Sequence, residues 1–102
     1  MSRKPLLPDG IAKTIPALYS QEHVSDPVVH CKFFHPLSNW TWYVTEFDPV
    51  ERMCFGLVDG FEEELGCFGL NELEGLLVRG LGIERDEHWT PRPLSTCWRQ
   101  RR

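Results

Sequence analysis

Residues 40–68 read WTWYVTEFDPVERMCFGLVDGFEEELGCF. Aromatic and β-branched side chains, which are typical of strands, recur in three segments of this stretch: residues 40–47, 53–58 and 61–68. Asp59-Gly60 lies between the last two segments, and a two-residue Asp-Gly loop favours the turn of a β-hairpin. The stretch therefore predicts three consecutive antiparallel strands joined as a meander.

The first of these strands is expected to have two different faces, because neighbouring side chains on a strand point in opposite directions. One face carries Trp40, Trp42 and Val44, and the other carries the residues between them, Thr41, Tyr43 and Thr45. Tryptophans on a half-buried strand mostly pack in a core, but Trp and Tyr also concentrate in protein interfaces. Both interpretations of the tryptophan pair stay open.

Outside this stretch, residues 28–34 predict a further strand and residues 83–89 a short extended segment. Apolar residues at helical spacing predict two short amphipathic helices. The first covers residues 7–18 with a break at Pro16, and the second covers residues 70–77 and ends at Gly80 and Gly82. The fold class is therefore α+β, with an antiparallel meander sheet of four to five strands packed against two short helices.

The chain has 102 residues, of which 41% are hydrophobic and 12% aromatic. This suits a single domain over residues 1–102, with flexible ends at 1–6 and 96–102. The chain begins at Met1, and we expect a complete small protein. No apolar run reaches the roughly 18 residues that a membrane span needs, and no signal peptide is visible. We therefore expect a cytoplasmic protein that makes no membrane contact.

Metal and cofactor sites have little support in the sequence. The four cysteines are widely spaced, and without export they are expected to be reduced thiols. His30, Cys31 and His35 are close in sequence, but adjacent residues of a strand point to opposite faces. Paired spacings such as Cys-x-x-Cys, which structural zinc sites usually have, are absent from the sequence. We expect no metal and no cofactor.

Charge is divided unevenly along the chain, which has a net charge of −4. Residues 46–88 contain twelve Asp and Glu against three Arg, a balance of −9, whereas residues 89–102 contain four Arg and no acid. A mostly acidic body argues against binding of nucleic acid, which depends on clustered Lys and Arg. Direct nucleic-acid binding through residues 92–102 is the third-ranked hypothesis.

Four motifs together carry a resemblance to a known family: Trp40-Thr41-Trp42, Phe55-Gly56-Leu57, Glu64-Leu65-Gly66 and Glu84-Arg85-Asp86. By their order and spacing the chain resembles, over residues 6–94, the bacterial family catalogued as domain of unknown function 2958. The resemblance implies an accessory protein of bacterial, plasmid or mobile-element genomes and implies no activity. The family pattern often has a serine where this chain has Gly69. Cys67 and Cys97 lie outside that pattern.

Two functional hypotheses follow from the residues. The first is a small non-catalytic protein-interaction or regulatory module, which binds another protein through the sheet face or the acidic hairpin. Its candidate binding residues are Trp40, Trp42, Glu46, Asp59, Glu64 and Arg85. The alternative is a small hydrolase or ligand-binding enzyme that uses clustered carboxylates. Its candidate catalytic residues are Glu46, Glu84, Asp86 and His88.

The alternative competes with a purely structural role for the same groups. Glu46 is then expected to pair with Lys32 or Arg85 across the sheet, and Asp59 is expected to be a turn residue of the hairpin. The sequence leaves the oligomeric state open.

Overall fold

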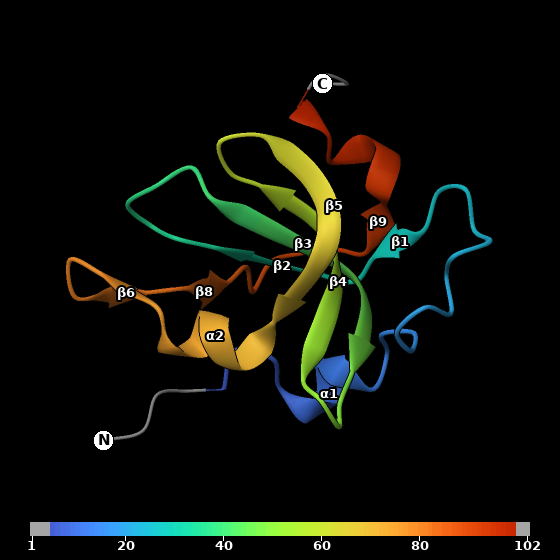
Figure 1. Cartoon of the computed structure of the whole chain (residues 1–102), viewed down its shortest axis with the longest axis horizontal. Coiled ribbons are helices and arrows are strands. Elements are labelled where there is room, and N and C mark those ends of the chain that lie inside the picture. Colours follow the sequence, from blue (N-terminus) through green and yellow to red (C-terminus); the bar gives the residue numbers. More distant parts are fainter. Residues whose placement is uncertain (1–4, 100–102) are drawn as a thin grey trace.

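The computed structural model describes residues 5–99. Its centre is a five-stranded sheet in the order β5-β4-β3-β2-β8, in which every neighbouring pair is antiparallel (Figure 1). The strands are β2 (Cys31–Phe34), β3 (Thr41–Asp48), β4 (Met53–Asp59), β5 (Glu63–Gly69) and β8 (Glu84–Arg85). The predicted α+β fold with an antiparallel meander is confirmed.

The predicted strand over residues 28–34 is interrupted at His30. Its first part, β1 (Val28–Val29), leaves the large sheet and pairs with β9 (Arg92–Pro93). The His30 backbone N–H still donates to the Val44 carbonyl oxygen at 2.9 Å. The C-terminal segment is thereby joined to the start of the sheet and continues into a short 3-10 helix, η1 (Leu94–Thr96).

The predicted two-residue turn at Asp59-Gly60 is wrong. Asp59 pairs with Glu63, so the loop consists of residues 60–62. A Cβ atom on Gly60 would lie 2.4 Å from the Trp40 ring. Glycine at position 60 therefore leaves room for the Trp40 ring to pack against the backbone, and it does not form a two-residue turn.

A two-residue turn does occur elsewhere, at Arg79-Gly80. These residues have φ values of 54° and 80° and join β6 (Leu77–Val78) to β7 (Leu81–Gly82). Two consecutive positive φ values are typical of the type I′ hairpin turn. This hairpin replaces the end of the predicted second helix, which was expected to run to residue 77.

The helices are shorter than predicted. α1 (Asp9–Ala12) is a single turn, and α2 (Leu70–Gly75) stops before Leu76, whose backbone is extended. Leu70 and Leu73 are the buried residues of α2. Because the packing surface ends with them, nothing favours another helical turn, and the chain turns into the hairpin instead.

Each face of the sheet has its own core. The first, on the side of α2, consists of Leu6, Leu7, Ile15, Cys31, Phe33, Trp42, Val44, Phe47, Cys54, Leu70, Leu73 and Ile83. The second lies under the C-terminal segment and consists of Val29, Tyr43, Leu57, Leu94 and Cys97. Leu6 and Cys97 belong to the segments expected to be flexible, and both are buried; residues 1–4 and 100–102 lie outside the described residues.

A β-bulge in β3 changes which residues face which core. Val44 is opposite Gly56, but Glu46 is opposite Phe55, so Thr45 is the extra residue. The Thr45 hydroxyl donates to the Phe55 carbonyl oxygen at 3.1 Å. Because of the bulge, Glu46 lies on the opposite face from Val44 and Trp42, whereas an unbroken two-residue alternation would have placed it on their face.

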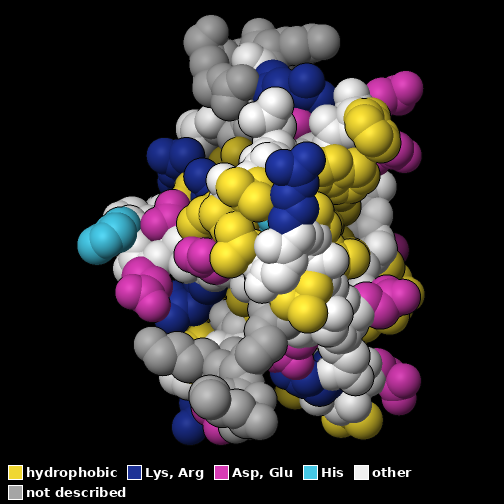
Figure 2. Space-filling view, turned by 90° about the vertical axis from the view of Figure 1, so that its left-hand side faces the viewer, with side chains coloured by type: hydrophobic (Ala, Val, Ile, Leu, Met, Phe, Trp, Pro, Cys, Tyr) yellow, Lys and Arg dark blue, Asp and Glu magenta, His cyan; other side chains and the backbone are white. Residues whose placement is uncertain are grey.

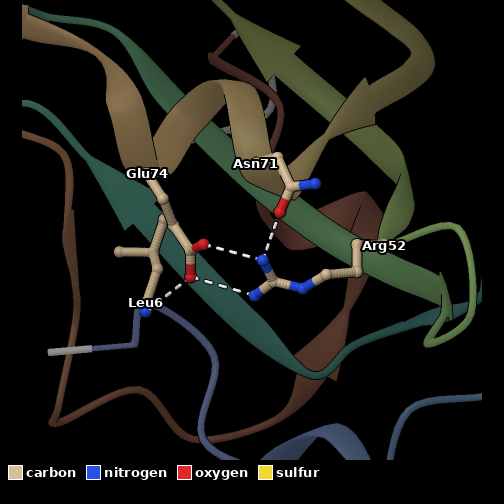
Figure 3. A network of polar contacts seen from close by, with 4 residues as sticks. All are labelled: Leu6, Arg52, Asn71 and Glu74. Atoms are coloured by element: carbon tan, nitrogen blue, oxygen red, sulfur yellow. Dashed lines mark hydrogen bonds and ion pairs between the residues drawn. The ribbon is translucent and has the colours of Figure 1, made fainter.

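A network of polar contacts fixes α2 against the sheet (Figure 3). The Arg52 guanidinium donates to both oxygens of Glu74, at 2.8 and 3.0 Å, and also contacts Asn71. One Glu74 oxygen accepts the Leu6 backbone N–H at 3.1 Å. The hydrogen bond to Glu74 raises the pKa of Arg52. The β3–β4 turn, α2 and the N-terminal segment are thus joined at one carboxylate.

The start of α2 offers a direct test of local capping. Gly69 precedes the helix with an extended backbone (φ −83°, ψ 129°) and makes no side-chain cap. A Cβ atom there would meet the end of the flexible Glu72 side chain, which can move. A serine at this position, three residues before Glu72, would complete a capping box.

Gly69→Ser is therefore expected to raise the free energy of unfolding by a few tenths of a kcal/mol, roughly 0.3–0.5. Urea denaturation measures the change. Gly69→Ala is the matched control, since it adds the Cβ atom without the hydroxyl and is expected to bring no such gain. A serine variant no more stable than the alanine variant would contradict the expected cap.

Candidate functional site

Glu46 is buried, with 4% of its surface exposed, and its carboxylate is hydrogen-bonded to the backbone of the same chain. It accepts the backbone N–H groups of Tyr19 at 2.6 Å and Gln21 at 3.0 Å. The predicted pairing with Lys32 or Arg85 is wrong, because the carboxylate caps the loop before β1 instead. Tyr19 has a φ of 69°, and these hydrogen bonds help to hold that uncommon backbone geometry.

Asp59, at the end of β4, forms an ion pair with an arginine of the same chain. The Arg99 Nε atom lies 3.0 Å from an Asp59 oxygen, and the Arg99 backbone N–H donates to Glu63 at 2.6 Å. Asp59 is only 8% exposed. Glu64, by contrast, is exposed on the edge strand β5. Of these two candidate binding residues, Glu64 is therefore the accessible one.

The arginines of the C-terminal segment have contacts of their own where the structure describes them. The Arg92 guanidinium lies over the Trp89 ring, 4.3 Å from its centroid, and Arg99 pairs with Asp59. Arg101 and Arg102 lie outside the described residues. Two of the four basic groups on which the nucleic-acid hypothesis rests thus already bind groups of this chain.

A cleft of about 540 Å³ runs along the β8 edge of the sheet. It is lined by Pro5, Leu6, Phe34, Gly82, Ile83, Glu84, Arg85, Asp86, Glu87 and His88. The cleft brings together Glu84, Asp86 and His88, three of the four candidate catalytic residues, and Glu46 is not in its lining. Asp86 lies 4.0 Å from the Lys32 Nζ atom and accepts the His88 backbone N–H at 2.9 Å.

Arg85 is the basic residue of this cleft. Its Nε atom is buried and has no hydrogen-bond partner among residues 5–99. A buried donor without an acceptor is costly, so such groups are rare in folded proteins.

A group of hydrophobic residues lies at the surface at one end of the fold. We call it the apolar face, and it consists of the partly buried Trp40 and the exposed Leu37, Phe61, Leu76, Leu77, Val78 and Leu81. The residues come from the β2–β3 loop, the β4–β5 loop and the β6–β7 hairpin, which lie on the same side of the molecule in Figure 1. Figure 2 views that side and shows hydrophobic side chains in a central band, with a Lys or Arg side chain in the middle of the band and acidic side chains on either side.

Two contacts join the parts of the apolar face. The Trp40 and Phe61 rings meet edge to face with their centroids 5.4 Å apart. The buried His35 ring accepts the Leu37 backbone N–H at Nδ1, and its Nε2 atom lies 3.1 Å from the Leu81 carbonyl oxygen. The accepting Nδ1 makes Nε2–H the donor to Leu81. One imidazole therefore ties the hairpin to the β2–β3 loop.

The sequence did not indicate the hairpin part of this face. Leucines at helical spacing predicted that Leu76 and Leu77 pack inside, whereas both are exposed, Leu77 at 61%. The tryptophan pair is divided between the two open interpretations: Trp42 is buried in the core, and Trp40 is half-buried beside the exposed Phe61.

The cysteines are free thiols of two kinds. Cys31, Cys54 and Cys97 are buried, and Cys67 is exposed on β5. Burial raises the pKa of Cys31 to about 12 and that of Cys54 to about 12. Thiols with such pKa values are protonated at neutral pH and are poor nucleophiles.

A thiol-reactive reagent such as DTNB is therefore expected to label the folded protein once, at Cys67, and to reach the other cysteines only after unfolding. Absorbance of the released thiolate counts the sites. Cys67→Ser is the control and should abolish labelling of the folded state. Fast labelling of that variant at neutral pH would show that a second cysteine is reactive.

Residues 5–99 contain no group of three or more His, Cys, Asp and Glu side chains placed to hold a metal ion. Within the same residues, no helix has the length and apolar character to cross a bilayer.

Comparison with known proteins gives one match. A family model described as "Protein of unknown function (DUF2958)" matches residues 6–101, which include all four motifs that carry the resemblance. No curated protein and no solved structure matches the chain.

Proposed function

The chain belongs to the DUF2958 family, whose description names no activity, and we propose from its surface that it is a small non-catalytic protein-interaction or regulatory module. The proposal extends to a cytoplasmic protein of bacterial or mobile-element origin. The observation that supports a role in protein interaction is the apolar face. Phe61 is 91% exposed and Leu77 is 61% exposed, and both lie among further apolar side chains rather than singly.

Exposed apolar groups gathered in one place are unusual on a protein that functions without a partner. The Trp40 ring contacts the Phe61 ring edge to face. This contact helps to orient Phe61, which is the most exposed ring of the apolar face. Rigid aromatic side chains are common energetic centres of interfaces. His35 in turn fixes the hairpin against the β2–β3 loop, so a partner would meet a preformed surface.

Charge selects the chemistry of the partner. The exposed Glu62 and Glu64 follow Phe61 on one side of the apolar face, and the exposed Glu84 follows the hairpin on the other. Residues 46–88 as a whole carry a balance of −9. The proposed partner is therefore a protein segment with apolar and basic side chains, since opposite charge speeds encounter and suppresses wrong partners.

Two short peptides test this chemistry, one of alternating Lys and Leu and one of alternating Glu and Leu. In a ¹H–¹⁵N NMR titration the Lys peptide is expected to shift the amide signals of the apolar face at millimolar concentration or below, and the Glu peptide is not. Leu77→Glu should abolish the shifts, and Val50→Glu, at the other end of the sheet, should leave them unchanged. Equal shifts with both peptides, or none with the Lys peptide, would contradict the proposal.

The second candidate function is a small hydrolase or ligand-binding enzyme. The observation in its favour is that Glu84, Asp86 and His88 line the same cleft. General acid–base catalysis requires such groups within reach of one substrate. Hydrolysis of a panel of activated esters, phosphoesters and glycosides tests it: activity lost in Asp86→Asn and kept in Glu64→Gln would support it, and no activity on any of them would count against it.

A further inference from the structure

The cleft beside β8 contains positive, negative and apolar groups, of which the second candidate function uses Glu84, Asp86 and His88. Arg85 is its basic group, and within residues 5–99 the Arg85 Nε atom is buried without a hydrogen-bond partner. The Nε atom is out of reach of solvent, so a ligand in the cleft would meet the two terminal nitrogens of the Arg85 guanidinium. A guanidinium suits a planar carboxylate, with which it can form paired hydrogen bonds.

The carboxylates of Glu84 and Glu87 line the cleft and do not belong to the ion pair of Lys32 with Asp86. Asp86 is balanced by Lys32, at 4.0 Å, whereas Glu84 and Glu87 are exposed at the cleft. A simple anion would be repelled by these two groups even as Arg85 attracted it. A ligand that carries an ammonium group next to its carboxylate would satisfy both signs of charge.

The apolar part of the lining comes from Leu6, Phe34 and Ile83, with Pro5 beside them, and His88 and Gly82 complete the cleft. A volume of about 540 Å³ lies within the range of small-molecule sites. We propose that the cleft binds a free aliphatic α-amino acid, with its carboxylate on Arg85, its ammonium group facing Glu84 or Glu87, and its side chain on the apolar lining. This deepens the second candidate function in its ligand-binding form and requires no catalysis.

Three related molecules separate the contributions of the two charges. L-Leucine carries both groups, 4-methylpentanoate lacks the ammonium group, and 3-methylbutylamine lacks the carboxylate. In ¹H–¹⁵N NMR titrations followed at the amides of residues 82–88, L-leucine is expected to bind in the millimolar range, and each analogue at least about tenfold more weakly.

Substitutions in the cleft show which side chains bind the carboxylate and the ammonium group of L-leucine. Arg85→Gln is expected to weaken L-leucine binding by about tenfold or more, and Arg79→Gln, an exposed arginine of the hairpin, to leave it unchanged. Glu84→Gln combined with Glu87→Gln should remove the advantage of L-leucine over 4-methylpentanoate. The melting temperature of Arg85→Gln is measured alongside, and a value equal to that of the parent chain shows that loss of binding does not result from unfolding.

The absence of saturable L-leucine shifts, or shifts that survive Arg85→Gln, would overturn the proposal. Binding by 4-methylpentanoate as tight as by L-leucine would also overturn it, because the ammonium group would then contribute nothing. Saturable binding with no turnover of any substrate would support this inference while removing the hydrolase. The peptide titration of the apolar face is independent of all these outcomes.

Discussion

Replacing Gly56 with alanine is expected to destabilise the fold by more than about 3 kcal/mol, which is a large part of the roughly 5–15 kcal/mol that usually stabilises a folded domain. A Cβ atom on Gly56 would lie 1.8 Å from the Tyr43 carbonyl oxygen and 3.2 Å from the Val44 Cα atom. Both are backbone atoms of the neighbouring strand beside the bulge, so they cannot move aside without breaking the pairing of β3 with β4.

Gly66 is a matched control for this change, because it pairs directly with Gly56 on β5 and has no atom within 4 Å of its own Cβ position. Gly66→Ala is expected to change stability by less than about 0.5 kcal/mol. Far-ultraviolet circular dichroism and urea denaturation of the two variants give the comparison. If Gly56→Ala folds as stably as Gly66→Ala, the described packing of β3 against β4 is wrong.

Glu46→Ala has the second largest expected effect, a loss of about 2–4 kcal/mol. The carboxylate accepts two backbone N–H groups, from Tyr19 and Gln21, and its removal leaves both donors in a partly buried place without an acceptor. Glu46→Gln should retain only part of the stability, because an amide presents one acceptor atom and one donor where two acceptors are needed.

The exposed Glu64 provides the control, since Glu64→Ala should lie within about 0.5 kcal/mol of the parent chain. Urea denaturation gives the free energies, and proteolysis of residues 16–27 shows whether the loop has been released. An alanine variant at position 46 with the stability of the Glu64 variant would show that the carboxylate does not hold the loop, and would restore Glu46 as a candidate functional residue.

Local patterns predicted the sheet because its determinants are local. The alternation of residues 40–44 and the apolar character of residues 53–58 need only the two-residue period of a strand. The bulge at Thr45 was not predictable in this way, since it depends on how closely β3 approaches Gly56 on the next strand. The leucine spacing of residues 70–77 predicted too long a helix, because periodicity does not show where the packing surface ends.

The site residues were predicted with less success for a similar reason. Glu46 was expected to act through β-sheet neighbours, but its partners lie 25 and 27 residues away in an earlier loop. The partner of Asp59 is Arg99, near the end of the chain. Long-range pairs of this kind leave no local signal. Glu84, Asp86 and His88 line the same cleft, and these three are neighbours in sequence.

Photo-crosslinking in the host cell tests the proposed interaction surface most directly. Benzoylphenylalanine is placed in turn at Leu77, Phe61 and Val50; Val50 is 84% exposed and lies at the other end of the sheet. The account predicts the same crosslinked protein from positions 77 and 61, through a segment rich in basic and apolar residues, and none of it from position 50. The same crosslinked protein from position 50, or none from positions 77 and 61, would contradict the account.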